Sequence, residues 1–349
     1  MMLQGHFVDC LLDPVYRDMD HMAYRIWKYG RGITAPCFYT ISGLIFSYLL
    51  LKAKTEGRDW KRLKKGVYRA FFLIVVGYAL RIPLFDWLSG YFSTYILVVD
   101  VLQVIGVSLI IICFFYLLSL RSAWLFGLLM LCLGVLIFAY QPLYSYFDYS
   151  WMPLPLENYM STINGSIFTF LPWFGYLCIG SSLAVLLHFE LKWKIPKWVF
   201  IADVIVLGIV FMIWSNDALL WLYHETENII FKEAAYNNFL FFRLGNVFII
   251  FGLFYALEKY LRKPLFLKIG QKTLSIYIIH FVILYGSFTG HGLGQYFAKS
   301  LSPISVIIGA AIFISLVCYL SMYVFETNSS VYVFIKRKLN RIKEFKNNQ

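Results

Sequence analysis

The feature that most constrains this chain is a series of nine apolar segments. Each is near the length of about 20 residues that a helix needs to cross a bilayer. They cover residues 33–52, 68–87, 99–119, 122–140, 167–187, 198–214, 239–257, 273–288 and 304–325. Charged residues are only 14% of the 349, whereas a soluble domain has about 25%. The sequence therefore predicts an all-α, polytopic membrane helical bundle rather than soluble domains.

A shorter apolar stretch, residues 1–12, precedes these nine segments. It is too short to cross a bilayer, so we interpret it as the end of a first membrane helix that is truncated in this numbering. Together with the nine segments, this truncated helix brings the predicted number of transmembrane helices to about ten. We expect that the natural reading frame continues upstream by about 10–20 mostly apolar residues, the length of the missing span.

The basic residues are distributed unevenly over the connecting loops. Twenty-three of the 31 Lys and Arg residues lie on alternate loops, namely 52–69, Arg121, 189–198, 258–272 and the tail. The positive-inside rule places these loops in the cytoplasm. We therefore expect a multi-pass protein of the cell membrane, with one transmembrane domain over 1–335 and a basic cytoplasmic tail over 336–349. The net charge of +12 reflects this topology, so we expect a bilayer as partner and no nucleic acid.

The six cysteines do not have the spacing of metal ligands. They are Cys10, Cys37, Cys113, Cys132, Cys178 and Cys318. Five of them lie in apolar runs and are interpreted as small core residues. We expect neither a disulfide framework nor a metal.

Ionisable side chains inside apolar segments tend to mark function, because burying them in a bilayer is costly. His6 lies where the first helix is expected to end. Asp9, a candidate substrate ligand, follows it at the edge of a polar loop. An unperturbed histidine titrates near pH 6.5, so His6 can accept a proton at neutral pH. In the segment 273–288, Tyr277 and His280 share one helical face. A purely structural hydrogen bond to a neighbouring helix is the alternative role for His280.

Two further segments carry polar residues near their start. Arg243 can reach the outer headgroups, or can bind an anionic group or a thioester carbonyl of a substrate. Asp100 and Gln103 open the segment 99–119 at i and i+3. They are candidate substrate ligands, but Asp100 can equally form a structural ion pair with Arg81 or Arg243.

Six stretches, in this order along the chain, together resemble the heparan-alpha-glucosaminide N-acetyltransferase-like branch of the transmembrane acyltransferases, which also include the acyltransferase-3 enzymes. They are MMLQGHFVD, ITAPCFYTISGLIFSYLL, DVLQVIGVSLI, FLPWFGYLCIG, FFRLGNVFII and IGQKTLSIYIIHF. The resemblance implies an acetyl-CoA-dependent acyltransferase in which His6 is the catalytic residue. It also implies that acetyl-CoA binds from the cytoplasm, as a co-substrate, and that an acceptor sugar binds from outside.

The implied reaction needs a base for the acceptor proton and a donor for the oxyanion. His6 is the candidate base, and Tyr277, His280 or Arg243 the candidate donors. Direct transfer and an acetyl-histidine intermediate both remain open. Cytoplasmic cations would hold the ADP end of the donor, and the candidates are Lys64, Lys65, Arg69 and Lys268.

The main alternative is a multi-pass transporter or flippase for a glycan or lipid-linked substrate, which would use the same Arg and His without chemistry. Such proteins often contain paired broken helices, whereas this sequence has one convincing break, near Pro172. A non-catalytic scaffold would not explain the polar face of 273–287. The acceptor's identity, and whether nitrogen or oxygen is acylated, stay open, with a homodimer as one possible assembly.

Overall fold

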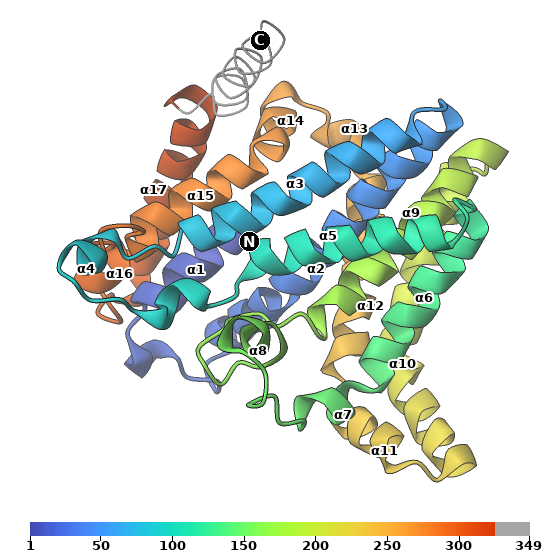
Figure 1. The fold of residues 1–349 in the computed structure, drawn as a ribbon, viewed down its shortest axis with the longest axis horizontal. Coiled ribbons are helices and arrows are strands. Elements are labelled where there is room, and N and C mark those ends of the chain that lie inside the picture. The colour runs from blue at the N-terminus through green and yellow to red at the C-terminus, as the bar shows by residue number, and fades with distance from the viewer. Residues whose placement is uncertain (325–349) are drawn as a thin grey trace, which may run out of the picture. The chain divides into compact units, whose positions relative to one another are not determined.

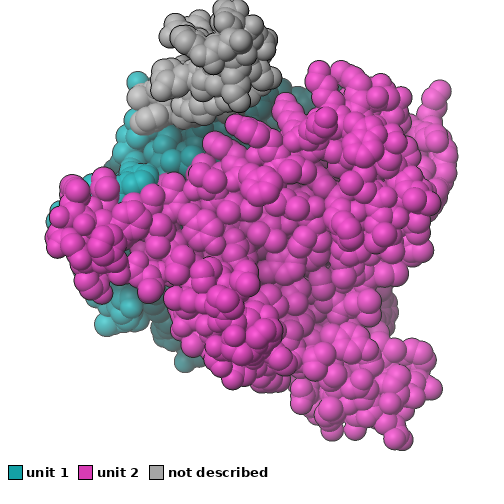
Figure 2. All heavy atoms as spheres, in the orientation of Figure 1, with its two compact units in different colours: residues 1–24, 259–349 teal, residues 25–258 magenta. Residues whose placement is uncertain are grey.

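The computed structural model describes residues 1–324, so the predicted tail at 336–349 and the end of the segment 304–325 lie outside the described residues. Within residues 1–324 there is no β-strand, only an isolated bridge between Leu12 and Leu301. The predicted all-α class is confirmed. The chain forms two compact units, unit 1 with Met1–Tyr24 and Lys259–Gln349 and unit 2 with Arg25–Glu258 (Figure 2).

Unit 2 is built from long helices joined by short ones. Its helices are α2 (Met22–Thr55), α3 (Asp59–Ala79), α4 (Leu84–Leu88), α5 (Val101–Leu118), α6 (Ala123–Ala139), α7 (Gln141–Ser145), α8 (Leu154–Met160), α9 (Trp173–Trp193), α10 (Lys197–Thr226), α11 (Ile229–Tyr236), α12 (Phe239–Ala256) and the start of α13 (Glu258–Leu261). Three pairs lie side by side: α3 with α5, α6 with α9, and α10 with α12 (Figure 1). The helices α10 and α12 approach each other closely at Gly208 and Gly245. A Cβ on Gly245 would lie only 2.5 Å from the Gly208 carbonyl oxygen, so a larger residue would not fit there.

Charged side chains join the helix ends at one end of unit 2. The Arg121 Nε donates to Asp59 over 2.7 Å, and the Tyr116 hydroxyl donates to the same carboxylate over 3.2 Å. Lys54 donates to the carbonyl of Arg121. Burial alone would raise the pKa of Asp59, but the hydrogen bonds and charge of Arg121 outweigh it and hold that pKa below its ordinary value. These hydrogen bonds therefore connect the segment 52–69 to the turn at 119–122.

Unit 1 consists of α1 (Met2–Leu11), α14 (Pro264–Gln271), α15 (Thr273–Tyr285), α16 (Leu293–Tyr296) and α17 (Pro303–Tyr319), followed by a π-helical turn (Leu320–Val324). Its core is a buried cluster from α1, α15 and α17 that includes Phe7, Ile279 and Phe313. The rings of Phe7 and Phe313 lie 5.2 Å apart. Burial of these apolar side chains holds α1 against α15 and α17.

Every predicted apolar segment contains a helix, but several ends differ. The helix α3 begins at Asp59 rather than at 68, because its basic first turns are good helix formers that carry no apolar signal. It ends at Ala79, shortly before Pro83. Within residues 1–324, six helices are long and apolar enough to cross a membrane, or seven if α14 and α15, bent by 67°, form one span. These helices agree with a polytopic bundle, and the number of about ten spans stays a prediction.

Candidate functional site

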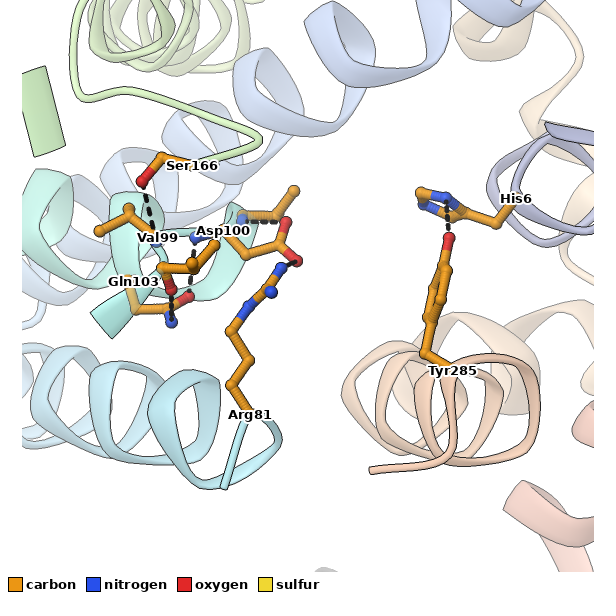
Figure 3. Close-up of polar contacts among 9 residues, drawn as sticks. His6, Arg81, Val99, Asp100, Gln103, Ser166 and Tyr285 are labelled. Carbon is orange, nitrogen blue, oxygen red and sulfur yellow. Dashed lines mark hydrogen bonds and ion pairs between the residues drawn. The ribbon is translucent and has the colours of Figure 1, made fainter. Parts of the chain in front are cut away.

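Unit 1 brings together two histidines and a tyrosine from helices far apart in the sequence. The Nδ1 of His6 on α1 lies 3.1 Å from the hydroxyl of Tyr285 on α15 (Figure 3). The imidazole of His6 stacks on that of His280, with ring centroids 5.3 Å apart and planes inclined by 27°. Two predicted site residues, His6 and His280, are thus in direct contact.

The end of α1 is fixed by hydrogen bonds to its last carbonyl groups, which have no partners within the helix. The Arg17 guanidinium donates to the carbonyl of Leu12 over 2.7 and 3.1 Å and to that of Asp9 over 2.9 Å. The backbone N–H groups of Lys299 and Leu301 donate to the carbonyls of Cys10 and Leu11. These bonds hold the helix that carries His6. The helix α1 continues to Leu11, so the expectation that it ends at His6 was wrong.

The helix α15 presents its aromatic residues in successive turns. The rings of Tyr277 and His280 meet edge to face at 5.0 Å, and Phe281 contacts Tyr285 at 4.9 Å. The His280 Nδ1 lies 3.3 Å from the carbonyl oxygen of Ile276. A carbonyl can only accept, so this nitrogen carries the hydrogen. In the neutral ring, Nε2 is then the acceptor nitrogen.

A glycine ends α15 directly after Tyr285. Gly286 has φ of +69°, which places it in the left-handed region, and its N–H closes the last turn on Val282. A Cβ there would lie 2.4 Å from the backbone nitrogen of Gly292. Ser287 lies beyond the end of the helix, so the polar face of α15 is carried by Tyr277 and His280.

The four residues His6, Tyr277, His280 and Tyr285 form a cluster that has a buried part and an exposed part. His280 is completely buried and Tyr277 is 4% exposed. Tyr285 is 38% exposed and His6 is half-buried. The hydrogen bond between His6 and Tyr285 is therefore at the surface, whereas the rings of His280 and Tyr277 are covered.

Asp100 and Gln103 form a polar network in unit 2. The Asp100 carboxylate forms an ion pair with the Arg81 guanidinium at 2.7 Å, and both side chains are nearly inaccessible (Figure 3). Asp100 also accepts from the N–H of Val101, and its own N–H donates to the Gln103 side chain. This capping box starts α5. The pairing with Arg81, one of the two roles open for Asp100, is present.

Arg243 on α12 is held by the first turns of α2. Its Nη1 donates to the carbonyl of Tyr29 over 2.9 Å, and its guanidinium lies 5.3 Å from the centre of the Tyr29 ring. The Tyr29 hydroxyl donates to Asn246 over 2.6 Å. A Cβ on Gly32 would collide with the guanidinium. The arginine thus joins α2 to α12 within unit 2.

The remaining predicted ligands are surface residues. Lys64, Lys65 and Arg69 are exposed along the first half of α3, and Lys268 is exposed on α14. Asp9 is half-buried on α1. No group of three or more His, Cys, Asp or Glu side chains within residues 1–324 could hold a metal ion.

Tyr285 is the site residue that sequence reasoning missed. It lies five positions beyond His280 on the same helix, and its partner is on a helix almost 280 residues away. One usable signal is Gly286, which follows Tyr285, because helices commonly end just before a glycine in the left-handed conformation.

The family model described as heparan-alpha-glucosaminide N-acetyltransferase, catalytic, matches residues 1–226. That range includes His6, Asp9, Asp100 and Gln103 and ends before Arg243. Neither the curated proteins nor the solved structures gave a match. The matched range holds the His6 side of the cluster, and α15, with Tyr277, His280 and Tyr285, lies beyond it.

Proposed function

The chain belongs to the heparan-alpha-glucosaminide N-acetyltransferase family, a family of membrane acetyltransferases, and from this premise we propose that it transfers an acetyl group from cytoplasmic acetyl-CoA to a sugar. The acceptor atom is an amine or hydroxyl on the extracytoplasmic side. The protein would act in the cell membrane, with its C-terminus in the cytoplasm. The observation that carries the proposal is the half-buried His6 bonded to Tyr285.

The proposed reaction assigns the proton to His6. The acceptor's N–H or O–H gives its proton to the ring as its nitrogen or oxygen attacks the thioester carbonyl. The carbon–sulfur bond then breaks, and the CoA thiolate takes the proton back from the imidazolium. In the alternative route, His6 itself attacks the thioester and carries the acetyl group to the acceptor.

An oxyanion forms on the carbonyl and needs a hydrogen-bond donor. In unit 1, Tyr277 is the better of the two predicted donors, because the Nδ1–H of His280 is already directed at Ile276. A neutral His280 would have no second N–H to donate. Arg243 is the third predicted donor, although its guanidinium is hydrogen-bonded to Tyr29.

The test of the reaction is incubation of the purified protein with acetyl-labelled acetyl-CoA, with and without candidate glycans. An acetyltransferase releases CoA and labels the glycan, whereas a transporter or flippase leaves acetyl-CoA intact. Label on the protein before acceptor is added would favour the acetyl-histidine route. Without CoA release for any amino sugar or glycan tested, the proposal would fall.

His6→Ala tests the assignment of the base. We expect turnover to fall by about 10²–10⁴-fold, the usual contribution of general acid–base catalysis. Expression and the unfolding temperature should not change. His291→Ala is the matched control, because His291 is also a unit 1 histidine near a tyrosine, Tyr296, at 3.3 Å. Wild-type turnover in His6→Ala would remove His6 from the mechanism.

A further inference from the structure

We propose that Tyr285 is a positioning residue that accepts a hydrogen bond from the Nδ1–H of His6 and so keeps Nε2 as the nitrogen that takes the acceptor's proton. The inference rests on the proposed function, because it concerns the same base. It adds a residue from α15, which lies beyond the range matched by the family.

The hydrogen bond between His6 and Tyr285 can run in either direction. A neutral imidazole has one N–H and one lone pair, and a tyrosine hydroxyl both donates and accepts. If the hydroxyl donates to Nδ1, the hydrogen of the ring is on Nε2, which then cannot act as a base. If Nδ1–H donates to the hydroxyl oxygen, Nε2 carries the lone pair. A base at Nε2 therefore requires Tyr285 to accept.

The surroundings restrict the ring of His6 on two sides. His280 stacks on one face of the ring, and Tyr285 binds its Nδ1 edge. Tyr285 is itself fixed as the last residue of α15 by the turn at Gly286. Stacking alone would allow the imidazole to rotate by 180° about its Cβ–Cγ bond, which exchanges the positions of the two nitrogens. The contact at the Nδ1 edge therefore sets which nitrogen points toward the substrate.

A phenol suits this role better than a carboxylate. His6 passes from neutral to protonated and back in each cycle, and Nδ1 keeps its hydrogen in both forms. The bond to Tyr285 is therefore retained throughout the reaction. An uncharged partner also avoids the desolvation cost of an ionised group beside the buried rings of His280 and Tyr277.

The first experiment measures the tautomer of His6 directly, without any substrate. The full-length protein is labelled with ¹⁵N at histidine, and the His6 signal is assigned by its loss in His6→Ala. We expect hydrogen on Nδ1 of the neutral ring in the wild type. In Tyr285→Phe the hydrogen should move to Nε2, the form that histidine favours in water. A wild-type ring protonated on Nε2 would overturn the inference, and this result does not depend on the variant's folding.

The second experiment measures kinetics. Tyr285→Phe should lower kcat by about tenfold, the effect of one hydrogen bond, with the KM for acetyl-CoA unchanged. Tyr296→Phe is the matched control, because its hydroxyl also contacts the Nδ1 of a histidine in unit 1, and its kcat should equal that of the wild type. An inactive His6→Ala together with wild-type kcat in Tyr285→Phe would overturn the inference and leave the proposed function standing. Full activity in His6→Ala would overturn both.

Discussion

Asp100 has two structural tasks at the start of α5. Its carboxylate caps the first turn of the helix and neutralises Arg81, whose side chain is only 3% exposed. The Arg81 guanidinium also lies 5.0 Å from the centre of the Tyr95 ring. Two buried charges in direct contact depend on each other, because either one alone would be left without compensation in an apolar interior.

Asp100→Ala is therefore expected to lower the free energy of unfolding by about 3–5 kcal/mol. Glu258→Ala is the control, because its ion pair with Lys197 is half-exposed, and such pairs contribute about 0–1 kcal/mol. The measurement is the thermal unfolding midpoint in detergent. Adding Arg81→Met to Asp100→Ala should recover part of the loss. A normal midpoint with a raised KM for the acceptor would instead indicate that Asp100 binds substrate.

At the scale of helices, the α1 end depends on Arg17. Three hydrogen bonds from one guanidinium satisfy carbonyls that the helix leaves open. Arg17→Ala should lower stability by about 1.5–3 kcal/mol, the range for hydrogen bonds to charged groups. It should also lower turnover, because His6 is on the same helix. Thermal unfolding and the acetyl-transfer assay measure both effects.

Two variants control the Arg17 experiment. Arg17→Lys keeps the charge but loses the fork that binds two carbonyls at once, so its effect should be intermediate. Arg25→Ala removes an exposed arginine nearby in the sequence and should change neither quantity. If Arg17→Ala unfolds at the wild-type temperature, the guanidinium does not hold the helix end.

The basic first half of α3 is the proposed contact for the donor's phosphates. Changing Lys64, Lys65 and Arg69 together to Gln should weaken acetyl-CoA binding by about tenfold, which is 1.4 kcal/mol, with little change for the acceptor. The double variant Arg25→Gln with Lys28→Gln removes exposed charge from the start of α2 and serves as control. Unchanged donor affinity in the triple variant would direct attention to Lys268 and the other residues of 258–272.

The sequence predicted where the helices lie but not which helices pack against each other. Apolar length located all nine segments, because hydropathy reports what a bilayer requires of a helix. It missed the charged start of α3 and the polar end of α10, because those turns are helical without being apolar. His6 and His280 stood out as polar groups in apolar runs. Their contact, and the role of Tyr285, depend on which helices pack together, which periodicity along one helix does not encode.

At the scale of the whole molecule, the charge pattern and the packing of unit 2 agree. Loops that the basic residues assign to one side meet at one end of the unit, where Arg121 bonds to Asp59. The loops 88–98 and 141–166, which this alternation assigns to the other side, also meet, since Asn158 donates to the carbonyl of Leu97 over 2.9 Å. Helices that alternate between these two ends are consistent with a chain that crosses the bilayer repeatedly.

This alternation predicts which positions an impermeant thiol reagent can reach in intact cells. With the native cysteines replaced by alanine, Lys64→Cys should be protected until the membrane is opened, because the positive-inside rule places 52–69 in the cytoplasm. Ile163→Cys, at a position 81% exposed on a loop of the opposite side, should be labelled at once. Both positions are at the surface of unit 2, so the difference reports the membrane rather than burial. Labelling of Lys64→Cys in sealed cells would show that the topology is the reverse of the predicted one. Acetyl-CoA would then have to enter from the opposite side.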